Sequence, residues 1–170
     1  SAIKTIEKAL TKAAHDDEIT LSPATFKENI SITKNVSIFG QNKEETIIEG
    51  MIIVPKGINV RFQHIQFRPS SHFQIEGEVI FESCDFQGVN TNAIFSVTNG
   101  QLSLKNCFIQ DASDIGLAAF NKSSIYVENC TFENNGKTHL LIEDSSLTIK
   151  NSALSNATHA IWLKEEASCI

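Results

Sequence analysis

Arginine is rare in this sequence, and acidic residues outnumber basic ones. Arg61 and Arg68 are the only arginines, and 14 basic residues against 20 acidic ones give a net charge of -6. A nucleic-acid-binding domain shows a basic patch or stripe, which this composition does not supply. The charge therefore predicts that nucleic acid is not a partner.

Long hydrophobic runs are also absent. No apolar stretch approaches the roughly 18 residues that a membrane-spanning helix needs. The N-terminus lacks the basic-then-apolar order of a signal peptide. We expect no membrane partner, and the localisation stays open because a piece of a longer protein carries no such signal of its own.

The apolar residues are of a strand-forming kind. Methionine, tryptophan and tyrosine occur once each, whereas isoleucine occurs 22 times and phenylalanine 11 times. β-branched and aromatic residues favour strands. With 170 residues, 41% of them hydrophobic, the chain is long enough for one domain with its own core. A single domain made mostly of β-sheet is therefore expected over residues 1–170.

A repeated apolar pattern occupies the middle and end of the chain. Five segments superimpose without gaps in the order apolar, any, apolar, any, any, small or apolar, any, apolar, and their first residues lie 19, 23, 23 and 22 positions apart. Alternation with a period of two indicates strands, and the two-residue interruption indicates a bend between them. The shared positions are Val60, Phe62, Ile65 and Phe67; Val79, Phe81, Cys84 and Phe86; Leu102, Leu104, Cys107 and Ile109; Ile125, Val127, Cys130 and Phe132; and Leu147, Ile149, Ser152 and Leu154.

The bend in each repeat carries a residue suited to a tight corner. Asparagine tolerates the left-handed backbone conformation that such a corner needs. Another short apolar strand precedes each pair, for example residues 93–97 before a turn at residues 98–100. The corner residues, of which the last three should form an asparagine ladder, are His64, Ser83, Asn106, Asn129 and Asn151.

Three short strands per repeat predict an all-β fold, the right-handed single-stranded parallel β-helix. About six coils of 22–24 residues would place the repeated apolar side chains in one shared core. Leucine-rich repeats have a similar period, but their motif needs an apolar residue three positions before the shared pattern. This chain has Glu76, Asn99, Lys122 and Asp144 there, and no amphipathic helical stretch follows. We therefore expect the β-helix.

The two ends of the chain differ. Residues 2–14 carry apolar side chains on one helical face, which predicts an amphipathic helix that caps the first coil, with β-helix coils over residues 19–170. Residues 168–170 align with the beginning of earlier strands. Because no capping helix follows them, we expect further coils or a fused domain beyond Ile170.

Residues 2–50 resemble the opening of the pectin-lyase-like β-helix superfamily. The run Ser22-Pro23-Ala24-Thr25-Phe26-Lys27-Glu28-Asn29-Ile30 is similar to that superfamily's proline, glycine, threonine, aromatic, any, glutamate run. It follows a similar cap helix and the segment Asp16-Asp17-Glu18-Ile19. Residues 58–170 resemble repeats of carbohydrate-binding and sugar-hydrolase β-helices, and such segments occur fused to other domains in some bacteria. The resemblance implies the fold far more than an activity.

The catalytic groups that this resemblance implies have no clear counterparts. Pectate lyases hold calcium with clustered acidic residues beside a basic residue, but both arginines lie about 10 Å along the axis from Asp111 and Asp114. The paired Asp, Gln and Arg motifs of pectinesterases are not found. Hydrolases need several acidic groups on one face, and a coil or loop separates Asp85 from this pair. We expect no catalytic residue, metal or cofactor; calcium enters only if the chain is a lyase.

Five residues are candidates for a binding site. Asp111 and Asp114 share a loop beside the strand that precedes each pair, where the superfamily's active clefts lie, although solvated loop residues look the same. His139 and His159 begin neighbouring strands and could meet across adjacent coils, as a polar pair rather than a metal pair because a third ligand is missing. Trp162, with Lys164 nearby, could stack on a sugar ring or pack against the protein.

Three cysteines share the spacing of the repeat. Cys84, Cys107 and Cys130 lie 23 residues apart and should point inward at one register. Three thiols in line would suit a metal, but a buried free cysteine behaves as a small hydrophobe. We expect a core ladder, which is compatible with a reducing compartment such as the cytoplasm.

Two functions from different classes remain. The favoured one is a non-catalytic β-helix module that binds a polysaccharide or protein partner, or acts as a scaffold, within a larger protein. The alternative is a polysaccharide lyase, esterase or hydrolase that acts on acidic glycans. A groove with at least three convergent acidic or basic groups, on the face that carries Asp111 and Asp114, would favour the enzyme.

Overall fold

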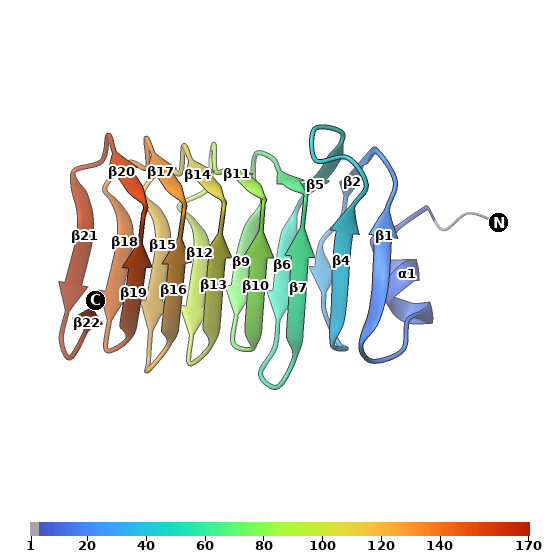
Figure 1. Cartoon of the computed structure of the whole chain (residues 1–170), viewed down its shortest axis with the longest axis horizontal. Helices are drawn as coiled ribbons and strands as arrows, with labels where there is room; N and C mark the ends of the chain where they lie inside the picture. Colours follow the sequence, from blue (N-terminus) through green and yellow to red (C-terminus); the bar gives the residue numbers. More distant parts are fainter. Residues whose placement is uncertain (1–3) are drawn as a thin grey trace.

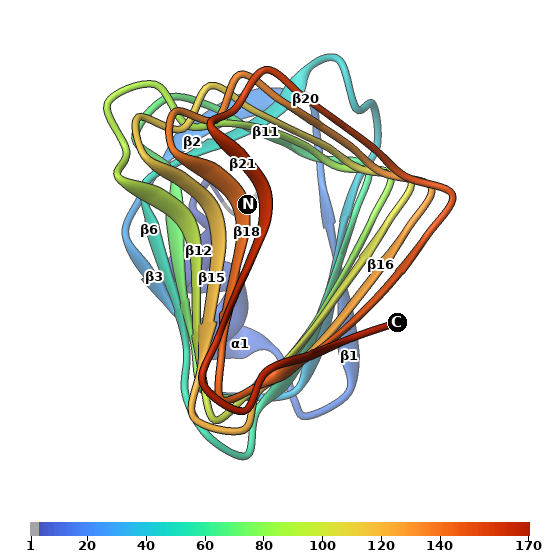
Figure 2. The ribbon, with the colours of Figure 1, turned by 90° about the vertical axis from the view of Figure 1, so that its left-hand side faces the viewer.

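The computed structural model describes residues 4–170 as a β-solenoid whose strands run parallel from coil to coil (Figure 1). The strands form three sheets of eight, seven and seven members, which we name A, B and C. The sheets are the sides of a roughly triangular cross-section (Figure 2). No helix in this range is long and apolar enough to span a membrane. The predicted all-β parallel β-helix is confirmed.

Each coil contributes one strand to each sheet, in the order A, B, C. Sheet A contains β1 (Asp17–Leu21), β4 (Val36–Gly40), β7 (Asn59–Gln63), β10 (Glu78–Glu82), β13 (Gln101–Lys105), β16 (Ser124–Glu128), β19 (Ser146–Lys150) and β22 (Ser168–Cys169). Sheet B contains β2 (Ala24–Lys27), β5 (Thr46–Glu49), β8 (Gln66–Phe67), β11 (Asp85–Gln87), β14 (Phe108–Gln110), β17 (Thr131–Glu133) and β20 (Ala153–Ser155). Sheet C contains β3 (Ile30–Ser31), β6 (Met51–Val54), β9 (His72–Ile75), β12 (Ala93–Thr98), β15 (Ile115–Phe120), β18 (Thr138–Glu143) and β21 (His159–Lys164). The first coils, whose apolar spacing is less regular, bring the number of coils to about seven, against the about six that the repeats indicated.

Neighbouring strands keep one register along the solenoid. In sheet A, Val60 pairs with Val79, and the same position continues through Leu102, Ile125 and Leu147. Side chains alternate between the two faces of a strand. The constant register therefore keeps the inward rows predominantly apolar, and the rows form one continuous core.

A single left-handed residue makes the bend between sheets A and B in five successive coils. The φ angle is 55° at His64, 54° at Ser83, 53° at Asn106 and Asn129, and 46° at Asn151. This residue turns the chain and changes which of the following side chains face inward, which is why the apolar spacing increases there. The predicted left-handed corner is confirmed at all five positions.

Phenylalanines from all three sheets stack in the middle coils. The ring centroids of Phe62 and Phe81 lie 5.0 Å apart, as do those of Phe67 and Phe86, and both pairs are nearly parallel. Rings from different sheets meet edge to face, such as Phe67 and Phe73 at 4.9 Å and 76°. Because aromatic quadrupoles favour such edge contacts, the rings add geometric specificity to their burial.

The cap over the first coil is shorter than the sequence predicted. The helix α1 (Ile6–Lys12) buries its apolar face against the core, whereas the sequence indicated a helix over residues 2–14. Thr5 is the N-cap and Ala13 is already extended, and residues 2 and 3 lie outside the described range. The apolar spacing runs past the helix because the extended Ala13 still packs on the core.

Two charged side chains of the first coil hold the ends of α1. The Glu28 carboxylate accepts the backbone N–H groups of Ile6 at 2.9 Å and Glu7 at 3.1 Å. The Lys34 ammonium donates to three carbonyl oxygens at the other end, the nearest being that of Ala13 at 2.6 Å. An anion at the N-terminus and a cation at the C-terminus satisfy free backbone groups and complement the helix dipole.

The last coil exposes side chains that are inward-facing in earlier coils. Leu163, in register with the buried Ile142, is 44% exposed, and Cys169, in register with the buried Leu147, is exposed as well. Further coils or a fused domain beyond Ile170 stay a prediction.

Removing the anion that holds α1 should loosen the cap. We expect Glu28→Ala to lower the free energy of unfolding by about 1–2 kcal/mol, because two backbone N–H groups lose their acceptor. Urea denaturation followed by circular dichroism measures this. Glu45→Ala, at an exposed carboxylate in the loop before β5, is the matched control and should change stability by less than about 0.5 kcal/mol. Equal stability of the two variants would contradict the assigned role of Glu28.

Candidate functional site

Sheet C and the loops before its strands form the face that carries the binding candidates. These loops, among them residues 88–92 and 111–114, project at one corner of the cross-section (Figure 2). In the outward row on sheet C, two central positions carry small side chains and the two ends carry larger ones. In strand register, this row consists of Gln74, Ser96, Ala118, Leu141 and Trp162.

A hollow of about 410 Å³ lies at the loop edge of this face. Ser70, His72 and residues 90–93 line it. Its polar groups are hydroxyls, amides and one imidazole. The hollow therefore offers hydrogen bonds and has no carboxylate in its lining.

The two candidate aspartates share the loop edge, but each has its own partner. Asp111 has a left-handed φ of 62° and accepts a hydrogen bond from the Gln87 amide at 3.3 Å. Asp114 forms an ion pair with Lys137 of the next coil at 3.1 Å. Among residues 4–170, no three His, Cys, Asp or Glu side chains gather as a metal ion would require. The face thus lacks a convergent acidic cluster over this range.

His139 lies buried beneath the same face. Its Nδ1 is 2.9 Å from the side-chain nitrogen of the buried Asn135, whose oxygen accepts the backbone N–H of Ala112 at 3.0 Å. The Asn135 nitrogen must therefore donate, and Nδ1 must be the unprotonated acceptor. Burial lowers the pKa of His139, and a hydrogen bond to the Ser155 carbonyl opposes this less strongly. The ring is therefore neutral near pH 7.

His159 and Trp162 stand on the outside of β21. Their rings stack with centroids 5.2 Å apart, and Nζ of Lys164 lies 4.4 Å from the Trp162 centroid. The tryptophan is 40% exposed. The register sets His159 opposite Thr138 rather than His139. One imidazole is outside and the other is buried, so the two do not form the pair that the sequence suggested.

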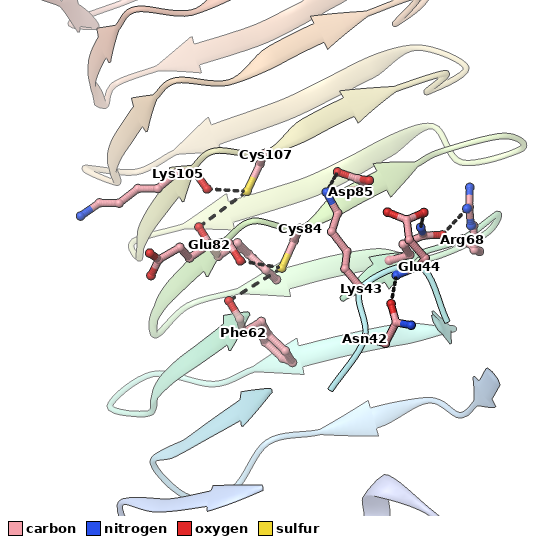
Figure 3. A network of polar contacts seen from close by, with 12 residues as sticks. Asn42, Lys43, Glu44, Phe62, Arg68, Glu82, Cys84, Asp85, Lys105 and Cys107 are labelled. Carbon is pink, nitrogen blue, oxygen red and sulfur yellow. Dashed lines mark hydrogen bonds and ion pairs between the residues drawn. The ribbon is translucent and has the colours of Figure 1, made fainter. Parts of the chain in front are cut away.

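A polar network on the outside of sheet B was missed by sequence reasoning. The loop at residues 41–45 lies over this sheet, where Lys43 pairs with Asp85 at 2.8 Å (Figure 3). In the same loop, Glu44 accepts a hydrogen bond from the amide of Gln66 at 3.2 Å. The loop thereby covers Gln66, which is 3% exposed although it faces outward.

Arg68 extends this network across the next coils. Its guanidinium donates to the side-chain oxygens of Gln66 and, at 3.4 Å, Gln87, and Gln87 donates in turn to Asp111. Arg68 and Asp111, which the sequence placed two coils apart, are thus linked through one glutamine. The signal that could have revealed the network is a row of long polar residues at one outward position, namely Arg68, Gln87, Gln110 and Glu133.

The three repeat cysteines occupy one buried column, as expected. Their Sγ atoms donate to the carbonyl two residues earlier, at 3.4 Å for Cys84 and 3.2 Å for Cys107 (Figure 3), and at 3.3 Å for Cys130. Burial raises the pKa of Cys84 to about 12 and also raises that of Cys107. A protonated thiol is a poor metal ligand, so the environment of Cys84 and Cys107 suits packing. The pKa of Cys130 is lowered instead, chiefly by its hydrogen bond with the Cys107 thiol.

Stacked parallel sheets with a single core define the class of protein, a parallel β-helix. A family model described as "Right handed beta helix region" matches residues 54–170, more than half of the chain. The chain belongs to this family, which establishes the right-handed fold.

Comparison with solved structures finds distant similarity to pectin methylesterases. The deglycosylated enzyme from Aspergillus niger is 13% identical, with a TM-score of 0.40 over 98% of this chain and 82% of that chain. A pectin methylesterase mutant in complex with a hexasaccharide is 12% identical, with a TM-score of 0.45 over 94% and 77%. No curated protein matches the chain. Similarity this distant carries no information on activity.

The three buried thiols of the cysteine column should not react with thiol reagents in the folded chain. Cys169 is exposed, whereas the other three thiols are buried. Because the thiolate is the reactive species, we expect Ellman's reagent to modify Cys169 alone in the native protein and all four thiols after unfolding in guanidinium. Cys169→Ser should abolish the native reaction. Rapid labelling of a native Cys169→Ser variant would show that the column is open to solvent.

Protonation of His139 should destabilise the coils that bury it. Its folded-state pKa lies below the 6.5 of a free imidazole. The stabilisation is therefore complete above this value and is lost as the pH falls through the lower folded pKa. Between about pH 6.5 and pH 4.5, the free energy of unfolding should fall more steeply than in His139→Gln, measured by urea denaturation. The exposed His159→Gln control should keep the wild-type slope, and equal slopes for wild type and His139→Gln would contradict the assignment.

Proposed function

We propose that this chain is a non-catalytic module that binds a polysaccharide along the outside of sheet C. The observation that carries the proposal is the Trp162 ring, which is partly exposed with the His159 ring and the Lys164 ammonium beside it. A partly exposed aromatic ring with an imidazole stacked on it and an ammonium over it combines apolar surface with hydrogen-bonding groups, which suits a sugar ring and its hydroxyl groups.

The rest of the face suits an extended ligand. Successive coils are spaced by about 4.8 Å, so a polymer that lies along the solenoid axis meets the same outward row in every coil. Ser96 and Ala118 are the small side chains of this row, and the Asp114–Lys137 ion pair lies in the loops at its edge. The hydroxyl and amide groups of the hollow at residues 90–93 add hydrogen-bonding capacity. Shape and chemistry together support a glycan ligand.

The polar groups of the face favour binding over turnover. Glycoside hydrolysis uses two carboxyl groups placed on either side of the scissile bond. The carboxylates of Asp111 and Asp114 are engaged by Gln87 and Lys137 instead. The buried His139 has its Nδ1 occupied by an amide donor. These contacts support a surface that holds a glycan without cleaving it.

Loss of the exposed indole should weaken glycan binding. We expect Trp162→Ala to raise the dissociation constant by about tenfold, which corresponds to one aromatic stacking contact of roughly 1–1.5 kcal/mol. Affinity electrophoresis with polygalacturonate, pectin, xylan and cellulose oligosaccharides selects the ligand, and calorimetry measures its affinity. Phe108→Ala removes an outward ring from sheet B and should bind like wild type. The proposal would be refuted if Trp162→Ala bound the glycan as tightly as wild type, or if wild type bound none of these glycans.

The same polysaccharides distinguish binding from catalysis. Incubated with the chain, with and without calcium, they should release neither new reducing ends nor unsaturated products. Calcium-dependent cleavage that disappears in an Asp111→Asn/Asp114→Asn variant would replace the proposal with the enzyme alternative.

A further inference from the structure

The outside of sheet A, on a different side of the cross-section from sheet C, carries a row of alternating charge (Figure 2). Glu82 of β10 lies in register with Lys105 of β13, followed by Glu128 of β16 and Lys150 of β19. With strands about 4.8 Å apart, the four charges form a line of roughly 15 Å. All four side chains are at least partly exposed.

Most of these charges are not used within the chain. Glu82 pairs with Arg61, but over residues 4–170 Lys105, Glu128 and Lys150 form no ion pair. The two ammonium groups lie 5.8 and 5.7 Å from the centroid of the Tyr126 ring, from the strands on either side of it. Over the described residues, sheet A therefore presents charges of both signs to solvent, three of which have no ion-pair partner within the chain.

We propose that the outside of sheet A is the contact surface between two copies of this chain, packed with antiparallel solenoid axes. The two-fold axis runs between the facing sheets, parallel to the strands and midway between β13 and β16. It sets Lys105 against the partner's Glu128, and Glu82 against the partner's Lys150. Symmetry repeats both contacts, so the row of four charges forms four pairs of opposite sign.

The neighbouring outward row is complementary in size under the same axis. This row runs in register through Ile80, Ser103, Tyr126 and Thr148. Tyr126 faces the partner's Ser103, and Ile80 faces the partner's Thr148. Large side chains thus meet small ones across the contact. The charged row (Glu82, Lys105, Glu128 and Lys150) and this second row share no residues, and both are complementary under the same two-fold axis.

Other symmetric arrangements of this surface are unfavourable. An axis parallel to the solenoid sets every strand, reversed in direction, against its own copy. Placed over the charged row it opposes Glu82 to the partner's Glu82, and placed over the neighbouring row it opposes Tyr126 to the partner's Tyr126. An axis that passes along β13 itself sets Lys105 against the partner's Lys105. Like charges opposed across an interface cost several kcal/mol. The axis midway between β13 and β16 pairs all four charges.

The size of the contact predicts a weak and reversible dimer. Under this axis β7 to β22 of sheet A face their counterparts over about 29 Å by about 16 Å, roughly 500 Å² on each copy. A total near 1,000 Å² is at the lower end for specific interfaces, so the dissociation constant is expected in the micromolar range or above. Because ion pairs at an open rim are screened, added salt should weaken the dimer.

Sedimentation velocity of the 170-residue chain tests the arrangement. From about 5 µM to about 500 µM, the sedimentation coefficient should rise from the monomer toward the dimer. Lys105→Glu and Glu128→Lys should each raise the dissociation constant at least about tenfold, because the axis turns each substitution into two repulsive contacts. Combined Lys105→Glu/Glu128→Lys exchanges the signs and should restore association. Lys8→Glu makes the same charge change on α1, away from sheet A, and should associate like wild type.

Circular dichroism spectra and thermal denaturation at low concentration establish that each variant is folded. A wild-type chain that stays monomeric over the whole range overturns the proposal. A double variant that associates no better than the two single ones overturns it as well, since restored association depends on the opposed pairing of Lys105 and Glu128.

Discussion

The hydrogen bonds between successive coils hold the strands in one parallel register, and every surface of the molecule depends on that register. It places one residue of each coil at the same point of the cross-section, so a single sequence position becomes a column. Inward columns are predominantly apolar, which accounts for the stacked phenylalanines and the line of cysteines. Outward columns are free to vary, and each sheet therefore carries its own chemistry.

Features that depend on spacing alone could be predicted from the sequence. The left-handed corner at Asn129 and the buried column that contains Cys107 follow from the repeat. Contacts that depend on side-chain reach could not be predicted. The link from Arg68 through Gln87 to Asp111 requires the path of two long side chains. The contact between Asn135 and the buried His139 ring requires room in the adjacent coil, where a Cβ at Gly116 would lie 3.1 Å from the Asn135 side-chain nitrogen.

The likeness to the pectin-lyase-like superfamily at residues 22–30 also acquires a physical reason. The glutamate that ends this run, Glu28, is the residue that accepts the first N–H groups of α1. The sequence similarity includes Glu28 without giving it a role, whereas the structure shows that Glu28 joins the cap helix to the first coil. Lys34 does the same at the other end of the helix. The cap is thus held by charge at both ends as well as by its apolar face, which explains how so short a helix stays in place.

Because each coil returns to the same register, the fold tolerates the insertion or deletion of a whole coil more readily than that of a single residue. One added residue within a strand would turn its inward side chains outward, whereas an added coil would meet the same kind of neighbour on both sides. The loops between sheets B and C and the turns between sheets C and A, whose lengths differ from coil to coil, absorb smaller changes. Duplication or deletion of whole coils during evolution would therefore lengthen or shorten the solenoid in steps of about 4.8 Å, and each remaining coil would keep the same kind of neighbouring coils.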